Sequence, residues 1–225
     1  SYMKMMNKKD FINILEEHNK LGFQKQIDYN KFYLYSIVTH STAIEGSTMT
    51  EIDNQLLFDE GLSAKGKSII EQNMNLDLKA AYERSMELAK AHTPISVGVL
   101  KHLSALVMRR TGGEVNGFGG SFDSSRGDLR LVNVTAGAGG KTYMNYQKVP
   151  QKLEEFCKEI NERRKELLES PDIYEQYKLS FYAHLKLVTI HPWVDGNGRM
   201  SRLIMNHLQY EFGLVPSKVV KDDKA

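Results

Sequence analysis

Apolar residues recur every three or four positions along most of the chain, in segments separated by Gly, Pro or capping residues. This spacing places apolar side chains on one face of a helix, so it predicts an all-α (mainly α) fold. Thr48 and Glu51 have the spacing of a capping box, and Ser96 is a predicted N-cap. The predicted helices cover residues 8–20, 30–44, 48–61, 68–91, 96–111, 150–170, 172–190 and 198–212.

The helical periodicity is lost in the glycine-rich region 112–140. Within it, Asp128–Thr135 alternates between two faces as a short strand does, and residues 141–149 contain tyrosines among β-favouring neighbours. A Gly-rich loop at 136–140 separates the two segments. The pattern therefore predicts a β-hairpin over residues 128–149.

Composition and charge narrow the expected partners and compartment. A chain of 225 residues, 41% of them hydrophobic, can bury one good core, which favours one compact domain. Thirty basic residues stand against 28 acidic ones without a long basic run, so we expect no nucleic-acid partner. No apolar stretch reaches membrane-spanning length, so we expect no membrane partner. The single cysteine, Cys157, cannot form an intrachain disulfide, and a buried thiol in a cytoplasmic protein is expected.

One stretch between two predicted helices, residues 191–202, has a composition suited to anions: His-Pro-Trp-Val-Asp-Gly-Asn-Gly-Arg-Met-Ser-Arg. Gly196 and Gly198 let backbone amides point into the turn, and the following helix begins with unpaired N–H groups and the positive end of its dipole. Arg199 and Arg202 are three residues apart, so both guanidinium groups rise from nearly the same helical face. Two such groups suit a polyphosphate better than a monophosphate.

The remaining polar residues of this stretch are candidates for metal binding, phosphate binding and proton transfer. Asp195 is a candidate Mg²⁺ ligand beside the phosphates, and Asn197 can donate its amide to a phosphate oxygen. His191 titrates near neutral pH and could take a proton from an attacking hydroxyl. A Gly-x-Gly turn alone is often structural, but this grouping within twelve residues favours function. Trp193 is expected to anchor the turn in the core, and His184 to be a core histidine.

The stretch resembles the signature of the Fic family, His-x-Phe-x-(Asp or Glu)-Gly-Asn-Gly-Arg-x-x-Arg, with Trp193 in place of the Phe. The resemblance implies an all-α core with a β-hairpin, the flap, beside an ATP site. It also implies that His191 is the base, that Asp195 binds Mg²⁺, and that Asn197 and the glycine amides hold the α-phosphate. Arg199 and Arg202 would hold the outer phosphates. Gly198 argues for transfer of AMP, because the subgroup that transfers phosphate has Lys there.

A second motif, Ser41-Thr-Ala-Ile-Glu45-Gly46, resembles the inhibitory motif of self-inhibited Fic proteins. The resemblance implies that Glu45 pairs with Arg202 and hinders the productive position of ATP. Bidentate pairing of a carboxylate with arginine gives such a contact a specific geometry. The alternative interpretation of Glu45 is an ordinary surface residue before a helix-ending glycine.

The flap of the family implies a docking surface for an extended segment of a target protein, through strand addition. Its counterpart here would be Leu131, Val132, Asn133 and Val134, within the hairpin 128–149. The alternative is a hairpin that only covers the core. The expected organisation is an N-terminal helical region 1–27, a Fic domain 28–215 with an inhibitory helix 28–46, and a tail 216–225.

The function that the resemblance implies is transfer of AMP from Mg-ATP to a Ser, Thr or Tyr hydroxyl of a target protein, or of the chain itself. Two alternatives remain at this point. In one, Glu45 positions a water that removes AMP from a modified protein. In the other, the chain senses ATP without turnover, as an interaction module.

Overall fold

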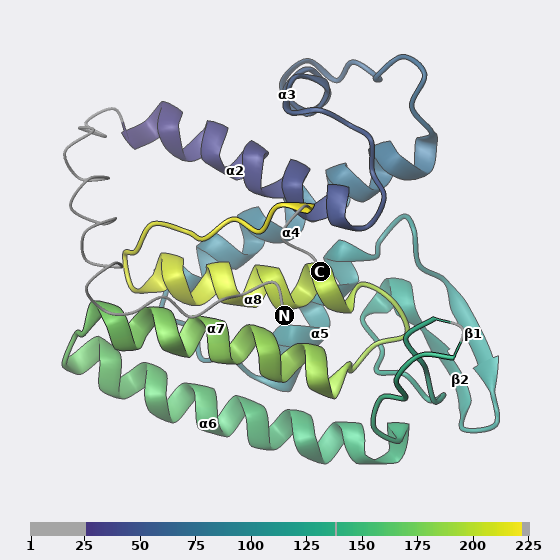
Figure 1. Cartoon of the computed structure of the whole chain (residues 1–225), viewed down its shortest axis with the longest axis vertical. Helices are drawn as coiled ribbons and strands as arrows, with labels where there is room; N and C mark the ends of the chain where they lie inside the picture. Colours follow the sequence, from purple (N-terminus) through teal and green to yellow (C-terminus); the bar gives the residue numbers. More distant parts are fainter. Residues whose placement is uncertain (1–25, 138, 222–225) are drawn as a thin grey trace. The chain divides into compact units, whose positions relative to one another are not determined.

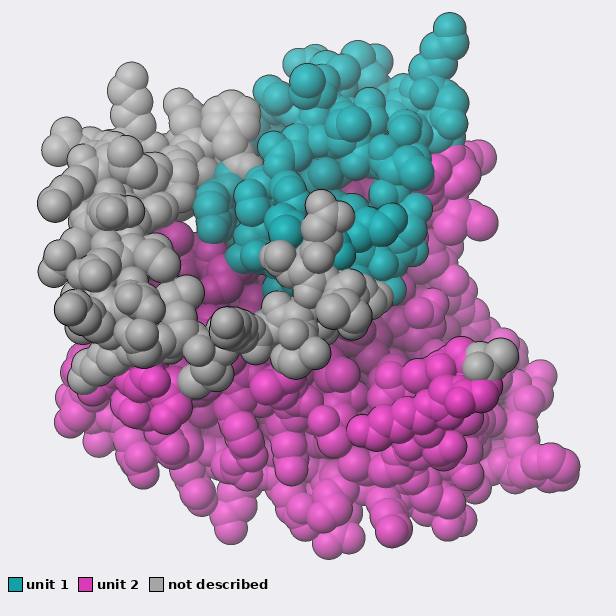
Figure 2. Space-filling view, viewed as in Figure 1, with its two compact units in different colours: residues 1–67, 218–225 teal, residues 68–217 magenta. Residues whose placement is uncertain are grey.

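The computed structural model describes residues 26–137 and 139–221, so the helix predicted at 8–20 lies outside the described residues. The chain divides into two compact units, residues 1–67 with 218–225 and residues 68–217 (Figure 2). The boundary falls inside the Fic domain expected at 28–215. The helices of the first unit are α2 (Gln26–Ile44) and α3 (Glu51–Glu60); those of the second are α4 (Ile69–Lys90), α5 (Val97–Val107), α6 (Val149–Glu169), α7 (Ile173–Ile190) and α8 (Asn197–Glu211).

The N-cap of α3 lies two residues beyond the predicted one. Thr50, and not Thr48, is the N-cap: its hydroxyl accepts from the backbone N–H of Asp53 (3.1 Å), and the Asp53 carboxylate accepts from the Thr50 N–H (3.0 Å). Glu51, the predicted partner of Thr48, accepts instead a hydrogen bond from Ser36 of α2 (2.7 Å). Two overlapping Thr-x-x-acid pairs fit a capping box, and the contact with α2 occupies the carboxylate of one of them.

In the second unit, α8 packs against α7, α4 and α5, and α6 packs against α7. Figure 1 shows α6, α7 and α8 side by side, with α8 in yellow. Most residues of α8 are buried, polar ones included. Three buried pairs join α8 to α4 and α6: Asn206 with Tyr82 (2.6 Å), His207 with Ser85 (2.7 Å), and Glu211 with Arg164. Because buried polar groups need partners, these pairs fix the rotation of α8 about its axis and so which of its side chains face α4 and α6.

The regular strands of the described chain form one antiparallel hairpin, β1 (Glu114–Gly117) and β2 (Gly120–Asp123), with Glu114 opposite Asp123. It is followed by a short 3-10 turn at Ser124–Arg126, which packs against α5. This hairpin lies within the glycine-rich region, but before the segment in which the sequence predicted strands.

The strands predicted within residues 128–149 do not form, and that prediction is wrong. The segment doubles back with a single bridge between Thr135 and Thr142, supported by a bond from the Tyr143 N–H to the Val134 carbonyl (3.2 Å). A second 3-10 turn, Tyr146–Lys148, then leads into α6. The segment 128–149 therefore keeps the predicted reversal of direction but lacks the hydrogen-bonded ladder.

Among the helices described in 26–137 and 139–221, none combines the length and apolar character needed to cross a membrane. Cys157 is buried on α6, as predicted, and burial raises the pKa of its thiol to about 12. The mainly helical fold expected from the spacing of apolar residues is confirmed.

Candidate active site

The candidate base, His191, is the residue at which α7 ends. Its backbone lies in the left-handed region (φ 51°, ψ 61°), and its N–H still donates to the carbonyl of Leu187 (2.9 Å). A residue other than glycine in this conformation costs on the order of 1–3 kcal/mol and persists only where its surroundings impose it. Pro192 follows directly and prevents another helical turn. The imidazole is thereby held at the junction of α7 and the turn that leads to α8.

Asn197 and Trp193 close this turn. The Asn197 side-chain oxygen accepts from the Trp193 backbone N–H (3.0 Å), and its amide donates to the Trp193 carbonyl (2.8 Å). Trp193 is fully buried, and its indole N–H donates to the carbonyl of Gly127 (3.1 Å), so the predicted anchoring role is confirmed. The side chain of Asn197, predicted to contact a phosphate, is occupied within the turn. Its contribution to a ligand would have to come from its backbone N–H, or the turn would have to open.

Gly196 makes the last step of the turn and is the N-cap of α8. Its φ of 81° favours glycine, and a Cβ at this position would lie 2.9 Å from the Met108 sulfur. No side chain caps the helix. Its first backbone bond runs from the Met200 N–H to the Gly196 carbonyl (2.9 Å), so the three preceding amides have no partner within the helix. Together with the helix dipole, they form a positive site suited to a phosphate.

Arg199 adds a buried cation to this helix end. The residue is 4% exposed, and its Nη2 reaches the Met108 sulfur (3.6 Å) and one oxygen of Asp195 (3.5 Å). Its Nε and Nη1 are buried and make no hydrogen bond within the described part of the chain. An incompletely paired buried cation is costly in free energy, and an anionic ligand would remove that cost. Arg199 and the amides before it thus fit the phosphates of a nucleotide.

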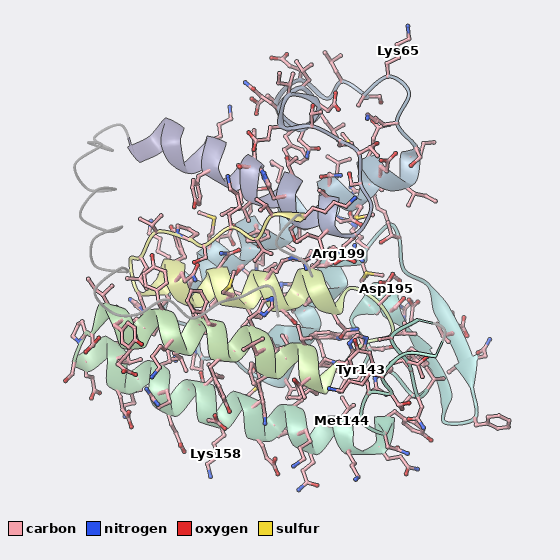
Figure 3. The ribbon with its side chains drawn as sticks, viewed as in Figure 1. Lys65, Tyr143, Met144, Lys158, Asp195 and Arg199 are labelled. Carbon is pink, nitrogen blue, oxygen red and sulfur yellow. The ribbon has the colours of Figure 1, made fainter. Side chains whose placement is uncertain are left out.

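Asp195 lies at the outer side of the same turn (Figure 3). Its side chain is 66% exposed, and its Oδ1 accepts from the Gly196 N–H (2.7 Å). The other oxygen, Oδ2, takes no hydrogen bond from the residues that the structure describes. No group of three ligating side chains occurs in the described ranges, so a cation here would share one carboxylate with phosphate oxygens. That donor set is the one Mg²⁺ commonly uses with nucleotides.

The surroundings of His191 keep its ring neutral. Burial lowers the pKa of the imidazole to about 4, and the positive charge of Arg130 acts in the same direction; the backbone of Val188 and the carboxylate of Asp195 oppose them. The ring of Tyr143 stacks on the imidazole with centroids 3.7 Å apart and planes inclined by 14°. At neutral pH the imidazole is therefore unprotonated and can accept a proton.

Arg202 lies one turn further along α8 than Arg199 and is buried. Its charge acts on two groups of neighbouring helices. Burial raises the pKa of the Tyr82 hydroxyl on α4, which Arg202 opposes, and burial lowers the pKa of His184 on α7 to about 4, to which Arg202 adds. His184 is buried, as expected for a core histidine.

Glu45 belongs to the first unit and is described there by itself. It follows the last residue of α2, and its N–H donates to the carbonyl of Thr42 (3.0 Å). The residue is exposed, whereas Ser41 and Thr42 of the same motif are buried. The motif therefore forms a helix end that presents its glutamate, which agrees with both interpretations of Glu45 given by the sequence.

Arg130 and Tyr143 belong to the site but were not identified as functional from the sequence. The Arg130 guanidinium donates to the carbonyls of His191 (2.7 Å), Val132 (2.9 Å) and Met144 (2.7 Å). These bonds explain the missing strands in 128–149, because two carbonyls that a ladder would use are bound by a side chain. One signal was present: Arg130 is the charged member of a face otherwise made of Val132 and Val134.

The predicted docking residues lie in this segment. Leu131, Val132 and Val134 are partly buried, and Asn133 is exposed and accepts from the Tyr146 N–H (2.9 Å). The β1–β2 hairpin covers one side of them: a Cβ on Gly119 would lie 2.5 Å from the Leu131 carbonyl, and one on Gly117 would lie 2.6 Å from Val132.

Comparisons with known proteins agree with this geometry. The model of the Fic/DOC family matches residues 94–209, just over half of the chain. Protein adenylyltransferase fic-1 of Caenorhabditis elegans is 28% identical over 187 residues, which are 82% of this chain and 33% of the relative. Protein adenylyltransferase Fic of Drosophila persimilis is 30% identical over 196 residues, 84% of this chain and 34% of the relative. The chain thus spans about a third of the length of these relatives.

The fold is shared with solved structures. A Fic domain containing signaling protein of Bacteroides thetaiotaomicron superposes with a TM-score of 0.75 at 17% identity, covering 89% of this chain and 71% of that one. The family match contains the whole turn 191–202 and the segment 128–149. The resemblance seen in the sequence is confirmed, and the chain belongs to the Fic/DOC family.

Proposed function

We propose that this chain is a protein adenylyltransferase, which transfers AMP from ATP to a Ser, Thr or Tyr hydroxyl of a protein. The observation that carries the proposal is the buried guanidinium of Arg199 at the uncapped start of α8, beside a neutral imidazole. Its Nε and Nη1 have no hydrogen-bond partner among the described residues. An anion site and a base at the same turn are the two requirements of this transfer. The relatives that match over most of this chain carry the same activity in their names.

In the proposed reaction, the hydroxyl oxygen attacks the α-phosphorus and His191 accepts the hydroxyl proton. The bond between the α-phosphorus and its bridging oxygen to the β-phosphorus breaks, and pyrophosphate leaves with the electron pair. The backbone amides at the start of α8 bind the α-phosphate, and Arg199 and Arg202 neutralise the outer phosphates. Asp195 would hold Mg²⁺, which supplies positive charge to the departing pyrophosphate.

Arrangement in space supports a role for the segment 128–149 in presenting the target. Its residue Tyr143 stacks on His191, so the segment is adjacent to the base. The proposed docking residues Leu131, Val132, Asn133 and Val134 would bind an extended stretch of the target through their main chain. A segment so close to the base would place the target hydroxyl within its reach.

Self-inhibition is a further part of the proposal. Glu45 would compete with the nucleotide for Arg202, as its motif predicts, because a carboxylate and a γ-phosphate need the same guanidinium. The position of Glu45 directly after the last residue of α2, in the motif 41–46, is the observation that supports this part of the proposal. With Glu45 unchanged, the chain would then transfer AMP only slowly.

The test uses the chain with ATP labelled at the α-phosphate and proteins of a cell lysate as acceptors. Glu45→Gly should raise protein-bound label at least 10-fold, and adding His191→Ala should abolish the gain, since general-base catalysis contributes roughly 100- to 10,000-fold. Glu60→Gly is a matched control, because Glu60 also ends a helix before a glycine. Labelling that does not depend on His191 would refute the transfer. Equal labelling by the Glu45→Gly and Glu60→Gly proteins would refute the inhibition alone.

A further inference from the structure

Arg130 has an unusual position for a charged side chain. It is 1% exposed and is among the largest fully buried side chains of the described chain. Within 26–137 and 139–221, its three side-chain hydrogen bonds all go to backbone carbonyls, and no carboxylate pairs with it. Burial lowers the pKa of its guanidinium. A buried cation without a counter-ion is costly, so the carbonyl bonds must compensate for its desolvation.

The three carbonyls belong to parts of the chain that are far apart in sequence. The His191 carbonyl is in the catalytic turn, and those of Val132 and Met144 lie on the outgoing and returning halves of the segment 128–149. The Arg130 backbone N–H adds a bond to the carbonyl of Pro192 (3.0 Å). One side chain thus joins the catalytic turn to both halves of the segment. Only arginine has a fixed fork of donors that can serve three acceptors in this way.

A second, independent contact lies at the same junction. Tyr143, which precedes Met144, stacks on the ring of His191 at 3.7 Å between centroids. Figure 3 labels Tyr143 and Met144 near the end of α7. Since Arg130 binds the carbonyl of Met144, it fixes the backbone that carries the Tyr143 ring. The position of the stacking ring therefore depends on Arg130.

We propose that Arg130 is a positioning residue for the transfer reaction: it holds the imidazole of His191 and the proposed docking segment in one geometry, with Tyr143 as the stacking contact. The effect of Arg130 on AMP transfer rests on the proposed function, whereas its effect on the position of His191 does not. Docking of a target on residues 131–134 would act on the same backbone that Arg130 ties to His191. Binding of the target and alignment of the base are coupled in this way.

The electrostatic surroundings agree with this role. Among the described residues, the charges of Arg130 and Asp195 act on His191, and the ring of Tyr143 stacks on its imidazole. Burial is the larger cause of the low pKa of His191, and the charge of Arg130 adds to it. Arg130 thus also disfavours the protonated imidazole, which could not act as a base.

The test measures the ring signals of His191 by NMR in histidine-labelled protein, with His191→Gln to assign them. A ring stacked on Tyr143 is shifted upfield by the aromatic ring current, and Tyr143→Leu calibrates that shift. Arg130→Met and Arg130→Lys should each remove most of the upfield shift, while the signals of buried His184 and His207 stay in place. Arg126→Met is the matched control, because Arg126 lies four residues away and is exposed, with 81% of its side chain accessible. It should change none of these signals.

Activity provides the second measurement. In the Glu45→Gly background, Arg130→Lys should lower the rate of AMP transfer on the order of 100-fold, the effect of misplacing a reacting group by about 1 Å, and leave the affinity for ATP unchanged. An unchanged His191 shift in both Arg130 variants would overturn the proposal. Displacement of the His184 and His207 signals in both variants would also overturn it, because Arg130 would then support the whole fold. If instead His191 proves unnecessary for transfer while the Arg130 variants still displace its signal, the proposed function fails and the positioning remains.

Discussion

The catalytic turn 191–202 and the segment 128–149 meet at His191, yet their hydrogen bonds are organised in different ways. In the turn, a local side chain closes the backbone, because Asn197 bonds to both main-chain groups of Trp193, and Nε and Nη1 of Arg199 have no hydrogen-bond partner among the described residues. The segment has one isolated bridge, and two of its carbonyls bind the guanidinium of Arg130, which also binds the carbonyl of His191, 61 residues away. The shape of the turn is therefore set by its own bonds, and the Arg199 guanidinium and the amides at the start of α8 can bind a ligand. The segment owes its shape to a residue whose side chain also contacts the turn.

The largest expected effect is on the affinity for ATP when the cation of Arg199 is removed. Arg199→Met should weaken ATP binding about 100-fold, or roughly 2.7 kcal/mol, because a charge-assisted contact to phosphate is lost. Without nucleotide, its free energy of unfolding should not fall, since an incompletely paired buried cation is replaced by an apolar chain. Calorimetric titration and denaturant unfolding measure the two effects. Arg109→Met, at an exposed arginine after α5, is the control. If the variant binds ATP normally, the anion site is not at the start of α8.

The rigidity of the turn is tested at Gly196. Gly196→Ala should lower the free energy of unfolding by about 2 kcal/mol, because it combines a φ of 81° with a Cβ 2.9 Å from the Met108 sulfur. Gly213→Ala separates the two causes, since its φ is 73° and nothing lies within 4 Å of its Cβ. It should cost about 1 kcal/mol, by backbone strain alone. Urea unfolding of both variants gives the difference, and equal losses would mean that Met108 yields to the added methyl group.

The packing of the segment is tested at Gly119. Gly119→Ala should cost about 1.5 kcal/mol, because its Cβ would lie 2.5 Å from the Leu131 carbonyl and 3.0 Å from the Tyr146 ring. Gly113→Ala, with nothing within 4 Å of the new Cβ, is the matched control in the same region. Thermal unfolding measures both. A variant as stable as the control would show that the β1–β2 hairpin moves freely against the segment.

Acid should weaken the junction between the two regions. The pKa of His191 is about 4 in the folded chain and near 6.5 when unfolded, so the unfolded state binds more protons between these values. The contribution of His191 to stability is complete above pH 6.5 and is lost as the pH falls toward 4, with a slope of at most about 1.4 kcal/mol per pH unit. Buried His184 and His207 have pKa values of about 4 and act in the same direction. His191→Gln should flatten the dependence seen in unfolding at pH 7, 6 and 5. An unchanged slope would place the imidazole in solvent.

The same difference explains what the sequence could predict. Helix positions follow from the spacing of apolar residues and from caps such as Ser96, whose hydroxyl accepts from the Val99 N–H (3.0 Å). The turn was predictable because its polar residues lie within twelve positions of one another, and the bonds that close it join Trp193 to Asn197. The strands expected at 128–149 fail because Arg130 binds the carbonyls of Val132 and Met144 that a ladder would use. Local alternation does not reveal that the same guanidinium turns inward to the carbonyl of His191, 61 residues away. Tyr143 escaped notice for the same reason, since its contact with His191 is not local in sequence.

The proposed chemistry requires the start of α8 to bind the phosphates of ATP beside His191. Backbone amide signals can be followed while the chain is titrated with Mg²⁺ and an ATP analogue with a methylene group between the α- and β-phosphates, which cannot be cleaved there. Large, saturable shifts are expected at Asn197, Gly198 and Arg199 and at the His191 ring, all lost in Arg199→Met. Shifts confined to other parts of the chain, or equal shifts in Arg199→Met, would contradict it.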